Sequence, residues 1–202
     1  MNFRLTVAVP RTRKFDVDAA TRAAAEVFWS CGYAGASTDS LLGAMGIGRQ
    51  SLYSTFGSKR DLYLRCLRQY GEDTTVAHVA RLTAPDDPVD GIREMLHGLV
   101  SDDDNLRARG CFAVAATAEF GRTDSDVARE LGRPEQRLRA RLLERVRQAR
   151  RIGRIRTTLD DMDVVEYISG QMVAVQVAAR GGAPAEQMHR SAEFAVLLLV
   201  NP

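Results

Sequence analysis

The chain has 202 residues, of which 45% are hydrophobic and 27% charged, proportions typical of soluble globular proteins. It lacks the run of about 18 apolar residues that a membrane helix needs, and its apolar patch near the N-terminus is shorter than a signal-peptide core. We therefore expect a cytoplasmic protein. Its three cysteines and three histidines are widely spaced, so we expect no metal site and no other cofactor.

Positive charge is concentrated towards the N-terminus. Residues 1–70 hold ten Lys and Arg against five Asp and Glu, whereas the rest of the chain holds 18 against 21. A basic front on a near-neutral body favours a polyanionic partner for the front. An imbalance of this size also arises by chance on a protein surface, so charge alone does not decide the question.

The sequence predicts two helices in its first 45 residues, the second of them short. Apolar residues three and four apart predict a helix over residues 16–29, and Gly32 is the expected stop signal. Ser37 stands where an N-cap is needed for a second helix that runs through Met45. Strand-like alternation is scarce along the whole chain, which favours an all-α fold.

A third and a fourth helix follow a glycine-rich break. The tripeptide Gly46–Gly48 separates the second helix from a third over residues 49–56. Ser58 and Asp61 have the spacing of a capping box, which opens a longer fourth helix that continues towards Leu82.

The remaining chain predicts five further helices. Asp87 and Pro88 fit the N-cap and first position of the fifth, and residues 101–105 are expected to form an acidic loop. The other four are predicted over residues 110–120, 124–152, 160–180 and 184–200. The helix over 110–120 is apolar on most sides and therefore expected to be buried, and that over 124–152 is expected to be interrupted or kinked near Pro134.

The second and third helices have the layout of a helix-turn-helix, which presents its second helix to the DNA major groove. Arg, Gln and Ser at the start of that helix suit base edges, and the hydroxyl and ammonium groups after them suit phosphates. The run from Gly46 to Gly57 contains no acid, which a merely solvated helix would be less expected to show. We assign base reading to Arg49, Gln50 and Ser51, and other DNA contacts to Arg13, Lys14, Thr38, Tyr53, Ser54, Thr55 and Lys59.

Residues 32–67, GYAGASTDSLLGAMGIGRQSLYSTFGSKRDLYLRCL, resemble the N-terminal domain of the tetracycline-repressor (TetR) family. The resemblance implies an all-helical homodimer of about nine or ten helices that binds a palindromic operator. It also implies an N-terminal arm and helix-turn-helix domain (1–62) and a larger ligand-binding and dimerisation domain (63–202). Repression in such proteins is relieved by a small-molecule effector. Gly48 departs from the family, which often has Ser there, but Gly is tolerated at a cap.

The last two helices resemble the pair through which the family dimerises. Their apolar stripes suit either the chain's own core or a four-helix interface with a second copy, and we favour the interface. The residues assigned to it are Val164, Ile168, Met172, Val175, Phe194, Leu197 and Leu198.

The resemblance implies a ligand pocket, which we expect among the fifth to eighth helices. Its candidate lining is Met95, Leu99, Cys111, Phe112, Ala116, Phe120, Gln171 and Met172. Glu119 and His97 either orient a polar group of the ligand or are satisfied structurally. Cys111 stands where some members of the family sense electrophiles or oxidants, so a redox- or electrophile-sensing repressor is the alternative function. The commoner role of such a thiol is that of a small buried residue.

Two other functions are weighed and set aside. Ten arginines between residues 133 and 156 suggest a second nucleic-acid surface, but leucines recur there at helical spacing, so a solvated face is expected. No Ser-His-Asp pattern or phosphate-binding glycine loop is visible, so we do not expect an enzyme. The sequence leaves open whether the regulator represses or activates, what effector it binds and which operator it recognises.

Overall fold

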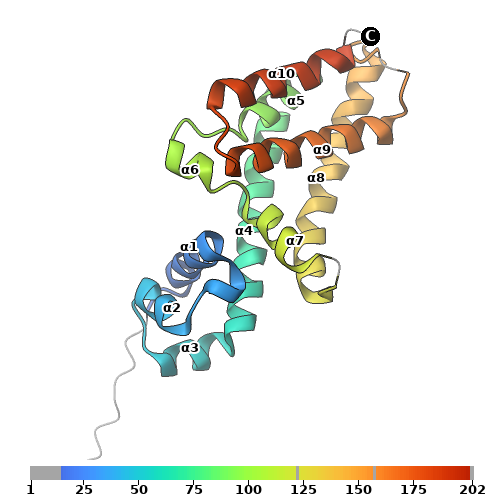
Figure 1. The fold of residues 1–202 in the computed structure, drawn as a ribbon. Helices are drawn as coiled ribbons and strands as arrows, with labels where there is room; N and C mark the ends of the chain where they lie inside the picture. Colours follow the sequence, from blue (N-terminus) through green and yellow to red (C-terminus); the bar gives the residue numbers. More distant parts are fainter. Residues whose placement is uncertain (1–14, 122, 157, 201–202) are drawn as a thin grey trace, which may run out of the picture.

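The computed structural model describes residues 15–121, 123–156 and 158–200, and within these residues it contains ten helices and no strand (Figure 1). In chain order they are α1 (Val17–Gly35), α2 (Thr38–Met45), α3 (Arg49–Phe56), α4 (Lys59–Thr83), α5 (Pro88–His97), α6 (Asp104–Ala108), α7 (Phe112–Phe120), α8 (Ser125–Arg151), α9 (Asp161–Arg180) and α10 (Ala185–Val200). None of these helices is long and apolar enough to cross a membrane.

The predicted start and stop signals act as expected in the N-terminal helices. The Ser37 side chain accepts a hydrogen bond from the Ser40 amide and caps α2, while Gly46 ends it in the left-handed region at φ 64°. Gly48 caps α3 without a side-chain hydrogen bond. The Ser58 side chain accepts from the Asp61 amide at the start of α4.

One hydrophobic core joins the N-terminal helices to the rest of the chain. Phe28 of α1 and Leu52 of α3 share it with Tyr63 of α4, and Phe112 and Ala116 of α7 complete it from the other side. Figure 1 shows α4 running from α3 up towards α5, α9 and α10, with α7 beside it. The core therefore draws residues from both sides of the predicted domain boundary at residue 62.

A second core lies at the far end of α4 and α8. It brings together α5, α8, α9 and α10 around buried aliphatic residues such as Ile92, Leu142, Val146, Ile168 and Val196. In Figure 1, α5, α9 and α10 lie at the end of the molecule opposite α3, and α8 runs up to them from beside α7.

Two local predictions differ from the structure, and of the interruption or kink expected at Pro134 the structure excludes the interruption. Helix α1 reaches Gly35, although Gly32 itself has non-helical angles (φ 73°, ψ 175°). Part of the expected acidic loop is helix α6, because the Asp103 carboxylate accepts hydrogen bonds from the next helical amides. Helix α8 is not interrupted at Pro134, whose buried ring packs closely on Gly71 of α4.

Candidate nucleic-acid interface and ligand cavity

Helix α3 leaves the residues assigned to DNA exposed or half-buried, and it buries the two residues that have no assigned DNA contact. Leu52 and Phe56, four residues apart, lie in the N-terminal core and fix the orientation of the helix. Arg49 and Gln50 are exposed at its start, and Ser51 is half-buried. Tyr53, Ser54 and Thr55 are exposed on the following turn. This side of α3 is therefore free to enter a groove of DNA.

Arg49 has a partner that the acid-free run of α3 did not predict. Its guanidinium lies 2.7 Å from the Asp39 carboxylate of α2, and both side chains are largely exposed. The pair holds Arg49 beside the turn of the helix-turn-helix, at the end of α3 that meets base edges in this motif. These two residues come together because the short turn and the shared core fix α2 and α3 relative to each other.

The other assigned DNA contacts lie at the edges of this surface. Thr38 is half-buried at the start of α2, and the half-buried Lys59 holds its ammonium 4.5 Å from the centre of the Tyr33 ring. Arg13 and Lys14 lie outside the described residues.

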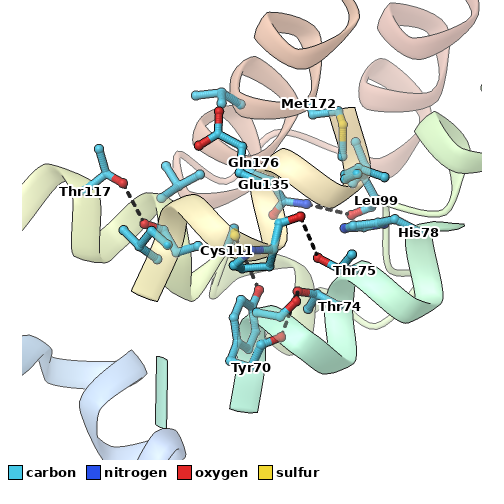
Figure 2. Close-up of a pocket in the computed structure, with 18 of the residues that line it drawn as sticks. Tyr70, Thr74, Thr75, His78, Leu99, Cys111, Thr117, Glu135, Met172 and Gln176 are labelled. Atoms are coloured by element: carbon cyan, nitrogen blue, oxygen red, sulfur yellow. Dashed lines mark hydrogen bonds between the residues drawn. The ribbon is translucent and has the colours of Figure 1, made fainter. Parts of the chain in front are cut away.

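A cavity of about 620 Å³, here called the central cavity, lies beyond the N-terminal core. Figure 2 shows its α4 wall, formed by Tyr70, Thr74, Thr75 and His78, facing Met172 and Gln176 of α9. Helix α7 and the residue before it supply Cys111, Ala113, Val114 and Thr117, and α8 supplies Leu131, Pro134 and Leu138.

Charged groups at the cavity wall are already paired. Arg107 is bound to Asp104 and donates to the Ser101 and Ala183 carbonyl groups. Arg139 forms a two-pronged pair with Glu166. Burial lowers the pKa of His78 to about 4, so this imidazole is neutral at pH 7. Glu135, also on the wall, is largely exposed and lies 4.0 Å from the Arg139 guanidinium. The described wall is therefore mostly apolar, and its charged groups have partners of opposite sign.

Tyr70 and Cys111 form a small network at the cavity wall. The Tyr70 hydroxyl donates to the Cys111 sulfur at 3.4 Å and accepts from the Phe112 amide at 3.3 Å. Burial and the neighbouring thiol raise the pKa of Tyr70 above its ordinary value, so the phenol stays protonated. The thiol is half-buried and borders the cavity (Figure 2).

Three of the eight predicted pocket residues line the central cavity: Leu99, Cys111 and Met172. The other five do not line it. Met95, Phe112 and Ala116 are buried in the two cores, and Phe120 and Gln171 lie off the cavity wall. Helix α7 turns Ala113, Val114 and Thr117 to the cavity and exposes Thr117, Ala118 and Glu119, so it is less buried than expected.

The sequence analysis missed the α4 wall altogether. Gly71, Thr74, Thr75 and His78 recur at helical spacing, so they share one side of α4. A stripe of small and polar residues on a helix that is otherwise packed was the signal that could have identified this wall.

Two profiles of known families match this chain. The profile of bacterial regulatory proteins of the tetR family matches residues 20–66, and that of the tetracyclin repressor-like C-terminal domain matches residues 88–194. The chain belongs to the TetR family of bacterial transcriptional regulators. Together the two TetR profiles cover the helix-turn-helix and most of the helices around the central cavity.

Named relatives agree with this membership. The HTH-type transcriptional regulator YezE of Bacillus subtilis (strain 168) is 36% identical over 129 residues, 63% of this chain and 66% of YezE, just under two thirds of that relative's length. The HTH-type transcriptional repressor ComR of Escherichia coli (strain K12) is 26% identical over 183 residues, 88% of this chain and 86% of ComR.

A solved structure of the TetR family regulator CifR, a cysteine mutant bound to a 26-base-pair operator duplex, superimposes with a TM-score of 0.79. It is 27% identical, and the match covers 94% of this chain and 99% of that one. The present chain is thus a TetR-family DNA-binding regulator with an N-terminal helix-turn-helix.

The side chains assigned to a TetR-type dimer interface fall into three groups. Val164, Ile168 and Val175 are buried inside the chain itself, so their assignment to the interface was wrong. Met172 is half-buried at the central cavity. Phe194, Leu197 and Leu198 of α10 are exposed by 61%, 40% and 47% and are free to meet a second copy.

The two polar residues with undecided roles both have protein partners. The Glu119 carboxylate accepts hydrogen bonds from the amides of Tyr33 and Ala34. His97 of α5 contacts His189 and Glu193 of α10. Neither residue lines the central cavity.

Proposed function

We propose that this protein is a homodimeric repressor that leaves a palindromic operator when a small molecule occupies the central cavity. The observation that carries the proposal is the position of α4 and α7, which form walls of the cavity and also pack in the core of the helix-turn-helix. A ligand that favours another arrangement of these helices changes DNA affinity by its differential affinity for the two states. The name of ComR, a transcriptional repressor, supports the direction of control.

We assign DNA binding and effector binding to opposite ends of the molecule. Residues 1–62 bind DNA, and residues 63–202 bind the effector and a second copy. Exposed apolar side chains on α9 and α10, including Val177, Phe194, Leu197 and Leu198, form the dimer contact. Two copies then present their α3 helices to half-sites about 34–36 Å apart, or a multiple of that distance.

The effector class follows from the cavity wall. The Arg107 and Arg139 side chains are engaged by carboxylates, His78 is neutral, and Glu135 lies beside Arg139, so the lining residues that the structure describes offer no free cation to an anionic ligand. An uncharged and mostly apolar molecule fits this lining, because its transfer from water costs no desolvation of charge.

A release assay tests the proposed effector site. Uncharged apolar compounds are screened, alongside anionic and cationic analogues, for loss of fluorescence anisotropy of a labelled operator. Active compounds should fail on the Ala113→Phe variant, which fills the cavity, and still act on Ala118→Phe, which changes an exposed residue of the same helix. Equal release from both variants, or activity confined to charged compounds, would contradict the assignment.

A second candidate function is a redox- or electrophile-sensing repressor switched through Cys111. It is favoured by the place of the sulfur at the cavity wall, 3.4 Å from the Tyr70 hydroxyl. In that case the Cys111→Ser variant binds operator normally but no longer responds to hydrogen peroxide or to an electrophile. An unchanged response in Cys111→Ser would remove this candidate.

A further inference from the structure

Helix α7 touches the ligand side and the DNA side of the molecule at once. Three of its residues, Ala113, Val114 and Thr117, line the central cavity. Its last turn carries Glu119, whose side chain reaches residues 33 and 34 at the end of α1 (the helices are shown in Figure 1). The helix therefore spans the distance between the cavity and the corner that leads into the helix-turn-helix.

The contact at that corner is two-pronged. One Glu119 carboxylate oxygen accepts from the Tyr33 amide at 3.0 Å, and the other accepts from the Ala34 amide at 3.0 Å. Gly32 departs from helical angles directly before these residues, which frees both amides from the regular ladder of α1. A Cβ atom at position 32 would lie 3.0 Å from the carboxylate, and φ is positive there, so both the space and the backbone favour glycine.

The segment directly before α7 is also tied to α1. The Trp29 indole donates to the Arg109 carbonyl at 3.0 Å, and the Arg109 guanidinium lies over the same ring at 4.1 Å and pairs with Glu26. Gly110 and Cys111, which follow Arg109, border the central cavity. Helix α7 and the segment before it are thus both bound to α1, the first helix of the DNA-binding part.

We propose that Glu119 is a positioning residue that transmits occupancy of the central cavity to the helix-turn-helix. The inference rests on the proposed release by a ligand. When an occupant displaces α7, it draws Glu119 away from Tyr33 and Ala34, and the corner loses two charge-assisted hydrogen bonds. Ala36 directly after this corner is fully buried and Ser37 caps α2, so movement of the corner turns α2 and α3.

Maleimide attached to Cys111 provides a cavity occupant before any natural effector is identified. The exposed Cys31 is replaced by Ser in every protein used. Cys66 is fully buried, and burial raises the pKa of its thiol to about 12, so it remains an unreactive thiol. N-ethylmaleimide then labels Cys111, and operator affinity is compared with and without the adduct by anisotropy.

The adduct is expected to weaken operator binding by about 10-fold in the Cys31→Ser parent, within the usual range of coupling between two sites. In Glu119→Ala and Glu119→Gln the same adduct should change the affinity by less than about 2-fold. The Glu144→Ala variant removes an exposed carboxylate of α8 and should behave as the parent. A full adduct effect in both Glu119 variants would overturn the inference while leaving the proposed release intact.

Hydrogen exchange of the two amides gives a readout that thermal stability alone does not move. Tyr33 and Ala34 should exchange about 10-fold faster in Glu119→Ala, and in the labelled parent, while the amides of the α5–α10 core keep their rates. Unchanged exchange in the labelled parent, together with weakened DNA binding, would also overturn the role of Glu119. An adduct that alters neither exchange nor operator affinity in the parent would contradict the proposed release itself.

Discussion

Arg49 is the side chain on which the base-reading account depends most. It stands first in α3, is exposed, and pairs with an exposed Asp39 at 2.7 Å. An exposed ion pair of this kind contributes about 0–1 kcal/mol, so Arg49 can exchange Asp39 for a guanine edge at little cost. Asp39 meanwhile limits the orientations of the guanidinium before DNA arrives.

The Arg49→Ala variant should lose about 1–3 kcal/mol of binding free energy on the operator and relax the preference at one base pair in each half-site. The Lys59→Ala variant is the contrast, because it should weaken binding to all duplexes alike and reduce the salt slope by about one. Titrations of operator and random duplex at several salt concentrations separate the two effects. Equal losses on both duplexes for Arg49→Ala would rule out its role as a base reader.

The sequence could predict which side chains of α3 are buried and which face outward, but not which residues line the central cavity. The four-residue spacing of Leu52 and Phe56 fixes which side of α3 is buried, and the polar residues then take the opposite side. Helix α7 has apolar or small residues on most sides, so its spacing did not reveal that Phe112 joins the N-terminal core while Ala113 borders the cavity. The Asp39–Arg49 pair depends on how two helices pack and has no local signal.

At the scale of elements, α4 and α8 pack closely against each other at Gly71 and Pro134. A Cβ atom on Gly71 would lie 2.8 Å from Cγ of the proline ring, which is rigid and buried. Gly71→Ala should therefore lower the free energy of unfolding by about 1–3 kcal/mol, the usual cost of overpacking. Gly132→Ala on α8 is the matched control, because nothing lies within 4 Å of its Cβ position and alanine favours the helix by about 0.5–1 kcal/mol. Urea unfolding of both variants checks the opposite signs, and a neutral or stabilising Gly71→Ala would contradict the close packing.

The same two helices are joined by an ion pair that depends on pH. Arg68 binds both oxygens of Glu130, which is 3% exposed, and these hydrogen bonds hold the pKa of Glu130 below its usual value of 4.5. A depressed pKa stabilises the folded state above about pH 4.5, and this stabilisation is lost as the pH falls through the folded pKa. Glu130→Gln should cost about 1–3 kcal/mol at pH 7 and progressively less below pH 4.5. A difference from the parent that stays constant down to pH 3 would show that charge is not the cause.

Most helix boundaries could be read from the sequence because short-range chemistry sets them. Ser37, Ser58, Asp87 and Asp160 cap the helices that were expected to follow them. The extension of α1 beyond Gly32 could not be read in this way, because the amides of Tyr33 and Ala34 are satisfied by a carboxylate 85 or more residues away. Helix α6 could not be predicted either, because it has only five residues and its acidic sequence suits a loop equally well.

At the scale of the whole molecule, the exposed side of α10 is the proposed dimer contact. Replacing Phe194 by Glu puts a charge where an apolar side chain is 61% exposed, and it should convert the dimer to a monomer with operator affinity reduced at least about 10-fold. Val76→Glu, at a 67% exposed position of α4, should leave the dimer intact. Sedimentation velocity of the two variants decides the matter, and a dimeric Phe194→Glu protein that still binds operator would place the interface elsewhere.

The sequence could not separate the two apolar stripes of α9 and α10. Val164, Ile168 and Val175 are as apolar as Leu197 and Leu198, but they face α5 and α8 of the same chain or neighbouring small clusters. Which stripe meets a second copy depends on which side the chain's own helices have already covered. That information lies in the arrangement of four helices, not in the spacing within one.

The most direct test of the account is selection of bound duplexes from a randomised DNA pool, followed by sequencing and by anisotropy titration of the enriched site. The account predicts a short inverted repeat, bound by a dimer, with affinity that falls steeply as salt rises. Arg49→Ala should blur one position of each half-site in the same experiment. Retained DNA with no enrichment over random sequence, from reduced protein at low salt, would contradict the account of α3 as a reader of an operator.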